Sequence, residues 1–145
     1  MLKRLSPLLT PDLLYVLRAM GHGDEISIVD ANYPADSAGP HVVRLDGVAA
    51  TDVVDAILSV MPLDDFVPEA AWHMEPAAGA SPDQPIFAAY RQLVEKHEGG
   101  KIKLNSIERF KFYERANKAY AMVATGERRL YGNIILKKGV IRPDE

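Results

Sequence analysis

The stretch from Thr10 to Asp30, TPDLLYVLRAMGHGDEISIVD, contains a helix signal, a glycine turn and a strand signal in direct succession. Thr10-Pro11-Asp12 is typical of a helix start, because threonine caps, proline fits the first position and an acid faces the helix dipole. Apolar residues then recur at helical spacing up to Met20, and Gly21 favours a helix end. Glu25 to Val29 is a β-rich run. A helix followed by a buried strand indicates an α/β fold.

The rest of the chain continues this alternation of strands and helices. Further strands are predicted at 42–45, 66–74, 101–104, 119–124 and 134–136. Further helices are predicted at 51–61, 84–97 and 105–118, the last because Asn105-Ser106-Ile107-Glu108 resembles a capping box. We therefore predict a single α/β domain over residues 1–145, with a central buried β-sheet covered by helices on both faces.

Composition excludes several classes of protein. The chain has 145 residues, 48% of them hydrophobic, and a net charge of −3, which is ordinary for one soluble domain. No cluster of Lys and Arg is present, so a nucleic-acid partner is not expected. No apolar run could span a bilayer, and Pro7, Pro11, Asp12 and Arg18 interrupt any signal peptide. We expect no membrane partner and a cytoplasmic protein. The lack of cysteine excludes disulfides and thiolate chemistry.

His22 is the first candidate for a catalytic residue. It lies between Gly21 and Gly23, on flexible backbone with little local packing to serve. An imidazole titrates near neutral pH, which suits a general acid and base. The structural alternative is a cation at a helix end that bonds the last carbonyls of helix 11–20.

Three further candidates carry polar groups suited to ligand binding. Asp30 follows a strand, and ligands of α/β sheets gather at carboxyl ends of strands, although a turn residue is the alternative. Arg109 lies in the first turn of a helix, where a cation opposes the helix dipole, which suggests that the guanidinium binds a partner. A surface salt bridge is the alternative explanation. Tyr131-Gly132-Asn133 offers a phenol, close backbone access and a carboxamide, or forms a simple turn.

The sequence carries no pattern for a metal or a cofactor. His41, His73 and His97 do not have the spacing of metal ligands, and no glycine-rich phosphate loop is present. We therefore expect neither a metal nor a cofactor.

Several ordered motifs, which span nearly the whole chain, resemble the ribose pyranase / L-fucose mutarotase family, and its fucose mutarotase branch most closely. The similar segments are Gly21-His22-Gly23-Asp24-Glu25-Ile26, Asp30-Ala31, Arg109-Phe110-x-Phe112-Tyr113-Glu114-Arg115, Thr125-Gly126-Glu127 and residues 131–140. The resemblance implies interconversion of the α and β anomers of L-fucose without a cofactor. It implies that His22 is the acid and base, and that Asp30, Arg109, Tyr131, Gly132 and Asn133 bind the sugar.

The resemblance also bears on specificity and assembly. The ribose branch has a histidine at the position of Arg109, so Arg109 favours fucose. Tyr120 stands where related chains often carry an aromatic residue, which makes it a further candidate for sugar binding. The family forms oligomers, including decameric rings, so we expect a homo-oligomer. The alternatives are a mutarotase or pyranase for another sugar, such as ribose or rhamnose, and a non-catalytic monosaccharide-binding protein.

The proposed chemistry raises a problem of geometry. Ring opening needs one group to remove the anomeric proton and another to protonate the ring oxygen, and Tyr131 is the candidate partner of His22. His22 and Asp30, however, are eight residues apart, and an extended chain covers roughly 26 Å over that span. Either the intervening strand bends back at Gly23, or the two residues serve one pocket from neighbouring subunits.

Overall fold

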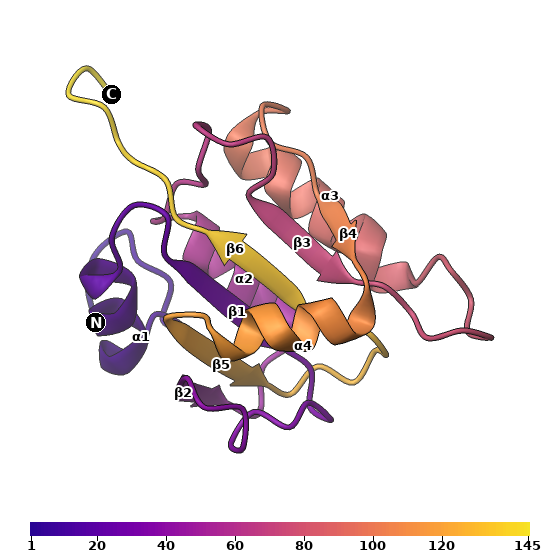
Figure 1. The fold of residues 1–145 in the computed structure, drawn as a ribbon. Helices are drawn as coiled ribbons and strands as arrows, with labels where there is room; N and C mark the ends of the chain where they lie inside the picture. The colour runs from indigo at the N-terminus through magenta and orange to yellow at the C-terminus, as the bar shows by residue number, and fades with distance from the viewer.

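A six-stranded sheet runs through the protein, which we describe over residues 1–145 from a computed structural model (Figure 1). The strand order is β2-β5-β1-β6-β3-β4. The strands are β1 (Glu25–Val29), β2 (His41–Leu45), β3 (Ala71–Met74), β4 (Asn105–Ile107), β5 (Ala121–Thr125) and β6 (Ile134–Lys137). The helices are α1 (Pro11–Ala19), α2 (Ala50–Leu58), α3 (Pro85–Glu98) and α4 (Arg109–Asn117). None of these helices combines the length and the apolar character needed to cross a membrane.

The strand directions give the sheet two distinct edges. β1, β2 and β5 are mutually parallel along the sheet, and β3 pairs in parallel with β4. β6 alone runs the other way, because it is antiparallel to both β1 and β3. The carboxyl ends of β1 to β5 therefore share one edge with the start of β6, which we call the carboxyl edge. The opposite edge, where β1 begins, is the amino edge.

Helices cover both faces of the sheet, as the sequence predicts. On one face, α1, α2 and α3 pack against alternate strand residues such as Ile26 and Ile28 of β1. On the other face, α4 crosses the sheet alone (Figure 1) and packs against Val29 and against Ile135 of β6. The alternation of side chains along each strand thus divides the apolar residues between two cores.

α4 is held at both ends, which fixes the residues at its start. The Glu108 carboxylate caps the helix by accepting the amides of Phe110 and Lys111, both at 3.0 Å. At the other end, the Arg115 guanidinium donates to Glu25 at 2.9 and 2.6 Å and lies 3.7 Å from the centroid of the Trp72 ring. The first turn of α4 therefore has a fixed place at the carboxyl edge.

Three predicted elements are wrong in their boundaries. Residues 101–104 do not form a strand; the strand is Asn105–Ile107, which pairs with β3, so the predicted capping box at 105–108 is not a helix start. The helix begins at Arg109 because Glu108 supplies the cap. The predicted strand 66–74 is confined to Ala71–Met74, because the Asp64 carboxylate accepts the Phe66 amide at 3.0 Å and holds a turn.

Truncation of Phe112 tests whether this side chain belongs to the core between α4 and the sheet. The Phe112 side chain is fully buried between α4 and the sheet, whereas Tyr15, on α1, is 70% exposed. Phe112→Ala should lower the free energy of unfolding by about 3–5 kcal/mol, measured by denaturant unfolding. Tyr15→Ala should change it by no more than about 0.5 kcal/mol. Equal effects of the two substitutions would contradict this account of the core.

Candidate functional site

A cavity of about 190 Å³ lies at the carboxyl edge, beside the start of α4. Four segments meet there: the residues after β1, the end of β3, the first turns of α4 and the loop before β6. Its lining residues are Asp30, Asn32, Tyr33, Met74, Arg109, Tyr113, Leu130, Tyr131 and Asn133. The structure thus brings together four of the predicted site residues, which come from three distant parts of the sequence. The small volume suits a small ligand.

Asp30 and Asn133 form a reciprocal pair at the base of this cavity. The Asp30 amide donates to Asn133 Oδ1 at 2.8 Å, and Asn133 Nδ2 donates to Asp30 Oδ2 at 2.9 Å. The Asn32 amide donates to the other carboxylate oxygen, Oδ1, at 2.9 Å. Burial raises the pKa of Asp30 above its usual value, although these hydrogen bonds work in the opposite direction. These two hydrogen bonds link the residue after β1 to the residue before β6.

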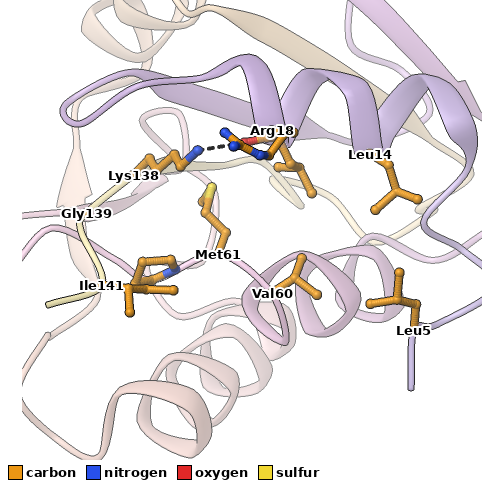
Figure 2. A pocket seen from close by; sticks show the side chains of 10 residues that line it. Leu5, Leu14, Arg18, Val60, Met61, Lys138, Gly139 and Ile141 are labelled. Carbon is orange, nitrogen blue, oxygen red and sulfur yellow. Dashed lines mark hydrogen bonds between the residues drawn. The ribbon is translucent and has the colours of Figure 1, made fainter. Parts of the chain in front are cut away.

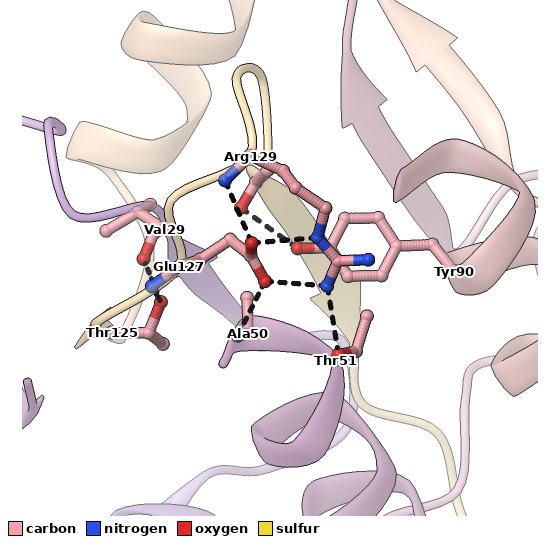
Figure 3. A network of polar contacts seen from close by, with 8 residues as sticks. Val29, Ala50, Thr51, Tyr90, Thr125, Glu127 and Arg129 are labelled. Carbon is pink, nitrogen blue, oxygen red and sulfur yellow. Dashed lines mark hydrogen bonds and ion pairs between the residues drawn. The ribbon is translucent and has the colours of Figure 1, made fainter. Parts of the chain in front are cut away.

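The loop before β6 is held by a buried carboxylate, that of Glu127 (Figure 3). Glu127 accepts the Ala50 amide at the start of α2, and it accepts the Arg129 amide and guanidinium at 2.8 to 2.9 Å. Arg129 also donates to Thr51 Oγ1 at 3.2 Å. Hydrogen bonds from Arg129 lower the pKa of Glu127, so the carboxylate is ionised. This network fastens residues 127–129 to α2.

The three residues that precede β6 are fixed by close contacts. Tyr131 has a φ of +59°, a left-handed conformation that is costly for a residue with a side chain. The Tyr90 hydroxyl donates to the Gly132 carbonyl at 2.9 Å. A Cβ atom on Gly132 would lie only 2.7 Å from Glu127 Cγ, so the loop needs glycine there. Tyr131 and Asn133 consequently face the cavity from a rigid turn.

A larger cavity, of about 390 Å³, lies elsewhere, among α1, the end of α2 and residues 138–141 (Figure 2). Its walls are mostly apolar. Lys138 contributes a charge, but Nζ already donates to the carbonyls of Leu17 and Met20 at the end of α1, at 2.7 and 2.5 Å. The cavity at the carboxyl edge is smaller, yet it combines a carboxylate, a guanidinium, a carboxamide and phenols.

His22 does not lie in that cavity, because it precedes β1 and therefore stands at the amino edge. His22 Nε2 is 3.0 Å from Asp64 Oδ1. The imidazole is 45% exposed, whereas the Asp64 side chain is 3% exposed. The ring of Phe66, itself on the surface, lies 5.3 Å from the imidazole centroid. Burial tends to raise the pKa of Asp64, but the bonds from His22 and from the Phe66 amide bring that pKa below its usual value.

Tyr120 is also at the amino edge and does not contribute to the cavity in the same subunit. Its amide donates to the Glu25 carbonyl at 2.8 Å, at the beginning of β1 and β5. The predicted residues therefore fall into two groups. Asp30, Arg109, Tyr131 and Asn133 line the cavity, with Gly132 packed behind them, whereas His22 and Tyr120 stand at the other end of the sheet.

Sequence reasoning missed Asp64 as the partner of His22, and Tyr33, Tyr113 and Met74 as cavity residues. Asp64 is one of two adjacent aspartates after α2, and no local pattern distinguishes it from Asp65. Tyr113 lies one helical turn after Arg109, and this spacing could have placed it on the same side of α4.

These features define an α/β protein with a small polar pocket at the carboxyl edge and a separate imidazole–carboxylate pair. The chain belongs to the RbsD / FucU transport protein family, whose model matches residues 3–141. It is 47% identical to the fucose mutarotase of Danio rerio, over 99% of this chain and 97% of that protein.

Two solved structures extend this comparison. The fucose mutarotase from Streptococcus pneumoniae, solved in complex with L-fucose, has a TM-score of 0.92 and 45% identity, covering 97% of this chain and all of that one. The Bacillus subtilis RbsD structure, complexed with D-ribose, has a TM-score of 0.72 at 23% identity, covering 98% and 100% of the two chains. The second likeness concerns the fold alone.

Substitution of Gly132 tests how tightly the loop is packed. A methyl group there would press on Glu127 and Ile86, so Gly132→Ala should destabilise the protein by about 1–3 kcal/mol in denaturant unfolding. Gly47 is a matched control, since a methyl group on its Cα would have no other atom within 4 Å. Gly47→Ala should be neutral or slightly stabilising. Indistinguishable unfolding curves for the two variants would show that the loop yields to the added group.

Proposed function

We propose that this protein is an L-fucose mutarotase, an isomerase that interconverts the α and β anomers by opening and closing the sugar ring. The identity to fucose mutarotases over nearly the full chain supports the reaction and the sugar. The observation that carries the chemistry is the half-exposed His22 imidazole bonded to the buried Asp64 carboxylate. A cytoplasmic location stays a prediction.

His22 is the proposed acid and base, and Asp64 orients it. An ionised carboxylate only accepts hydrogen bonds, so the neutral imidazole carries its proton on Nε2, toward Asp64. Nδ1 is then free to take the proton of the anomeric hydroxyl. The C1–O5 bond breaks as O5 is protonated, the aldehyde turns, and closure on its other face returns both protons. Such proton transfer contributes roughly 10²–10⁴-fold to a rate.

The cavity residues hold the sugar and supply the second proton. The Asp30 carboxylate accepts sugar hydroxyls, and Arg109 donates to them, both through charge-assisted hydrogen bonds. Asn133, which is hydrogen-bonded to Asp30, and the backbone at Gly132 are the remaining sugar-binding groups. The complementary proton comes from a phenol of the cavity: Tyr131 is our candidate, and Tyr113, which is also partly exposed, is the alternative.

We further propose that one active site is built from two subunits of a homo-oligomer. The cavity and the His22–Asp64 pair stand at opposite edges of one sheet, farther apart than a monosaccharide can reach. Large apolar side chains are exposed at both edges: Phe66 beside His22, and Phe110 and Leu130 beside the cavity. Such residues are suited to burial against a second copy. A decameric ring is the subunit number that the family resemblance implies.

Removal of the imidazole should abolish catalysis and leave the fold intact. His22→Ala should slow anomer exchange of L-fucose by about 10²–10⁴-fold, measured by saturation-transfer NMR at equilibrium. Asp64→Asn should impair exchange as well, because it removes the charge that orients the imidazole. His41 pairs with Asp12 at 3.1 Å on the surface, so His41→Ala is a matched control that should retain exchange. Unchanged exchange in His22→Ala would remove this residue from the mechanism, and a panel including ribose and rhamnose would identify another preferred sugar.

A mixture of two inactive variants tests the shared site. His22→Ala keeps an intact cavity, and Arg109→Ala keeps an intact His22–Asp64 pair. In hybrids assembled at equal ratio by co-expression, about a quarter of the subunit contacts would join an intact cavity to an intact pair, restoring about a quarter of the activity. Hybrids as inactive as the parents, or a monomer with full activity, would contradict a site shared between subunits.

A further inference from the structure

The Tyr33 hydroxyl is a buried polar group without a partner. Tyr33 follows β1 by four residues and lines the cavity together with Asp30 and Arg109. Its hydroxyl oxygen has less than 1 Å² of exposed surface and makes no hydrogen bond; among all buried side-chain oxygens and nitrogens, only that of Ser27 shares this condition. Burial raises the pKa of Tyr33, so the phenol keeps its proton and can donate it.

Packing does not explain this hydroxyl. The Tyr33 ring lies 6.3 Å from the Phe112 ring in an edge-on arrangement and 5.2 Å from the Tyr113 ring. A phenylalanine would make the same ring contacts. A buried donor without a partner lowers the stability of a protein, and such groups in native proteins generally have a ligand, a water or a functional role. The cost at Tyr33 therefore indicates a partner that enters through the cavity.

We propose that the Tyr33 hydroxyl is a substrate-binding group, which donates a hydrogen bond to a hydroxyl of the monosaccharide held by Asp30 and Arg109. This inference rests on the proposed sugar site. The backbone fixes the position of the residue, because its amide donates to the Asp30 carbonyl at 3.1 Å and its carbonyl accepts the Ala35 amide at 2.8 Å. The adjacent Tyr113 ring, 5.2 Å from the Tyr33 ring, is only partly buried, so a rotation of its side chain on sugar binding would bring the Tyr33 hydroxyl into reach.

The test is Tyr33→Phe, which removes one oxygen and keeps the ring. We expect the affinity for L-fucose, measured by isothermal titration calorimetry, to fall roughly 3- to 10-fold, the worth of one hydrogen bond. The melting temperature of the sugar-free protein should stay unchanged or rise, because the unpaired donor is gone. Tyr15 on α1 is 70% exposed, so Tyr15→Phe is the matched control, with unchanged affinity and melting temperature.

Deoxy analogues of L-fucose identify the sugar hydroxyl that Tyr33 binds. For one analogue, the one without that hydroxyl, the wild-type protein and Tyr33→Phe should bind equally well, whereas the other analogues should keep the difference. Unchanged affinity for fucose in Tyr33→Phe would overturn the proposal. A loss of melting temperature in the sugar-free variant would also overturn it, since the hydroxyl would then have a partner within the protein.

The binding measurement separates this inference from the proposed reaction. A wild-type protein that binds L-fucose but does not accelerate its anomer exchange would refute the mutarotase, while a weakened Tyr33→Phe would still support the hydroxyl as a sugar ligand. A wild-type protein with normal exchange and a Tyr33→Phe variant of unchanged affinity would refute the role of Tyr33 alone.

Discussion

The pairing of β1 on both of its sides determines how the functional groups are distributed. β1 is parallel to β5 and antiparallel to β6, so its five residues stay extended and span roughly 17 Å. The Gly23 amide donates to the Lys138 carbonyl at 2.9 Å, which continues this pairing beyond the start of the strand. Residues 21–24 form a turn in which Gly23 has a φ of +86°, but the chain is extended from Glu25 to Val29, so His22 and Asp30 are kept at opposite edges of the sheet.

Much of the fold could be predicted because local signals and tertiary demands agree. Thr10 and Pro11 begin α1 as their chemistry suggests, and the apolar runs at 25–29 and 134–136 become central strands with one side in each core. The signals conflict at 101–109. Asn105 resembles a cap, but the edge of β3 offers it a hydrogen-bonding ladder, and the Glu108 carboxylate caps α4 by accepting two amides. Tertiary pairing decides between two acceptable local patterns.

Site residues could be predicted from the sequence only where a local sequence pattern marks them. Asp30 and the triplet Tyr131 to Asn133 are each ambiguous by themselves, and their pairing across 103 residues follows from the β1–β6 ladder. Asp64 and Tyr33 give no signal, because their importance depends on burial that other elements provide. A carboxylate next to an imidazole and a phenol without a partner exist only in the folded chain.

Energetic costs are concentrated at the cavity, and rigid supports surround it. Tyr131 is in a left-handed conformation, the Asp30 carboxylate is buried enough to raise its pKa, and the Tyr33 hydroxyl has no partner. The Glu127 network and the Tyr90 hydroxyl behind the loop offset these costs and keep the loop in place. In the proposed sugar site, a polyhydroxyl ligand would give the Tyr33 hydroxyl the partner that the protein alone does not supply, and a binding site that carries such costs when empty is favoured to close on a ligand.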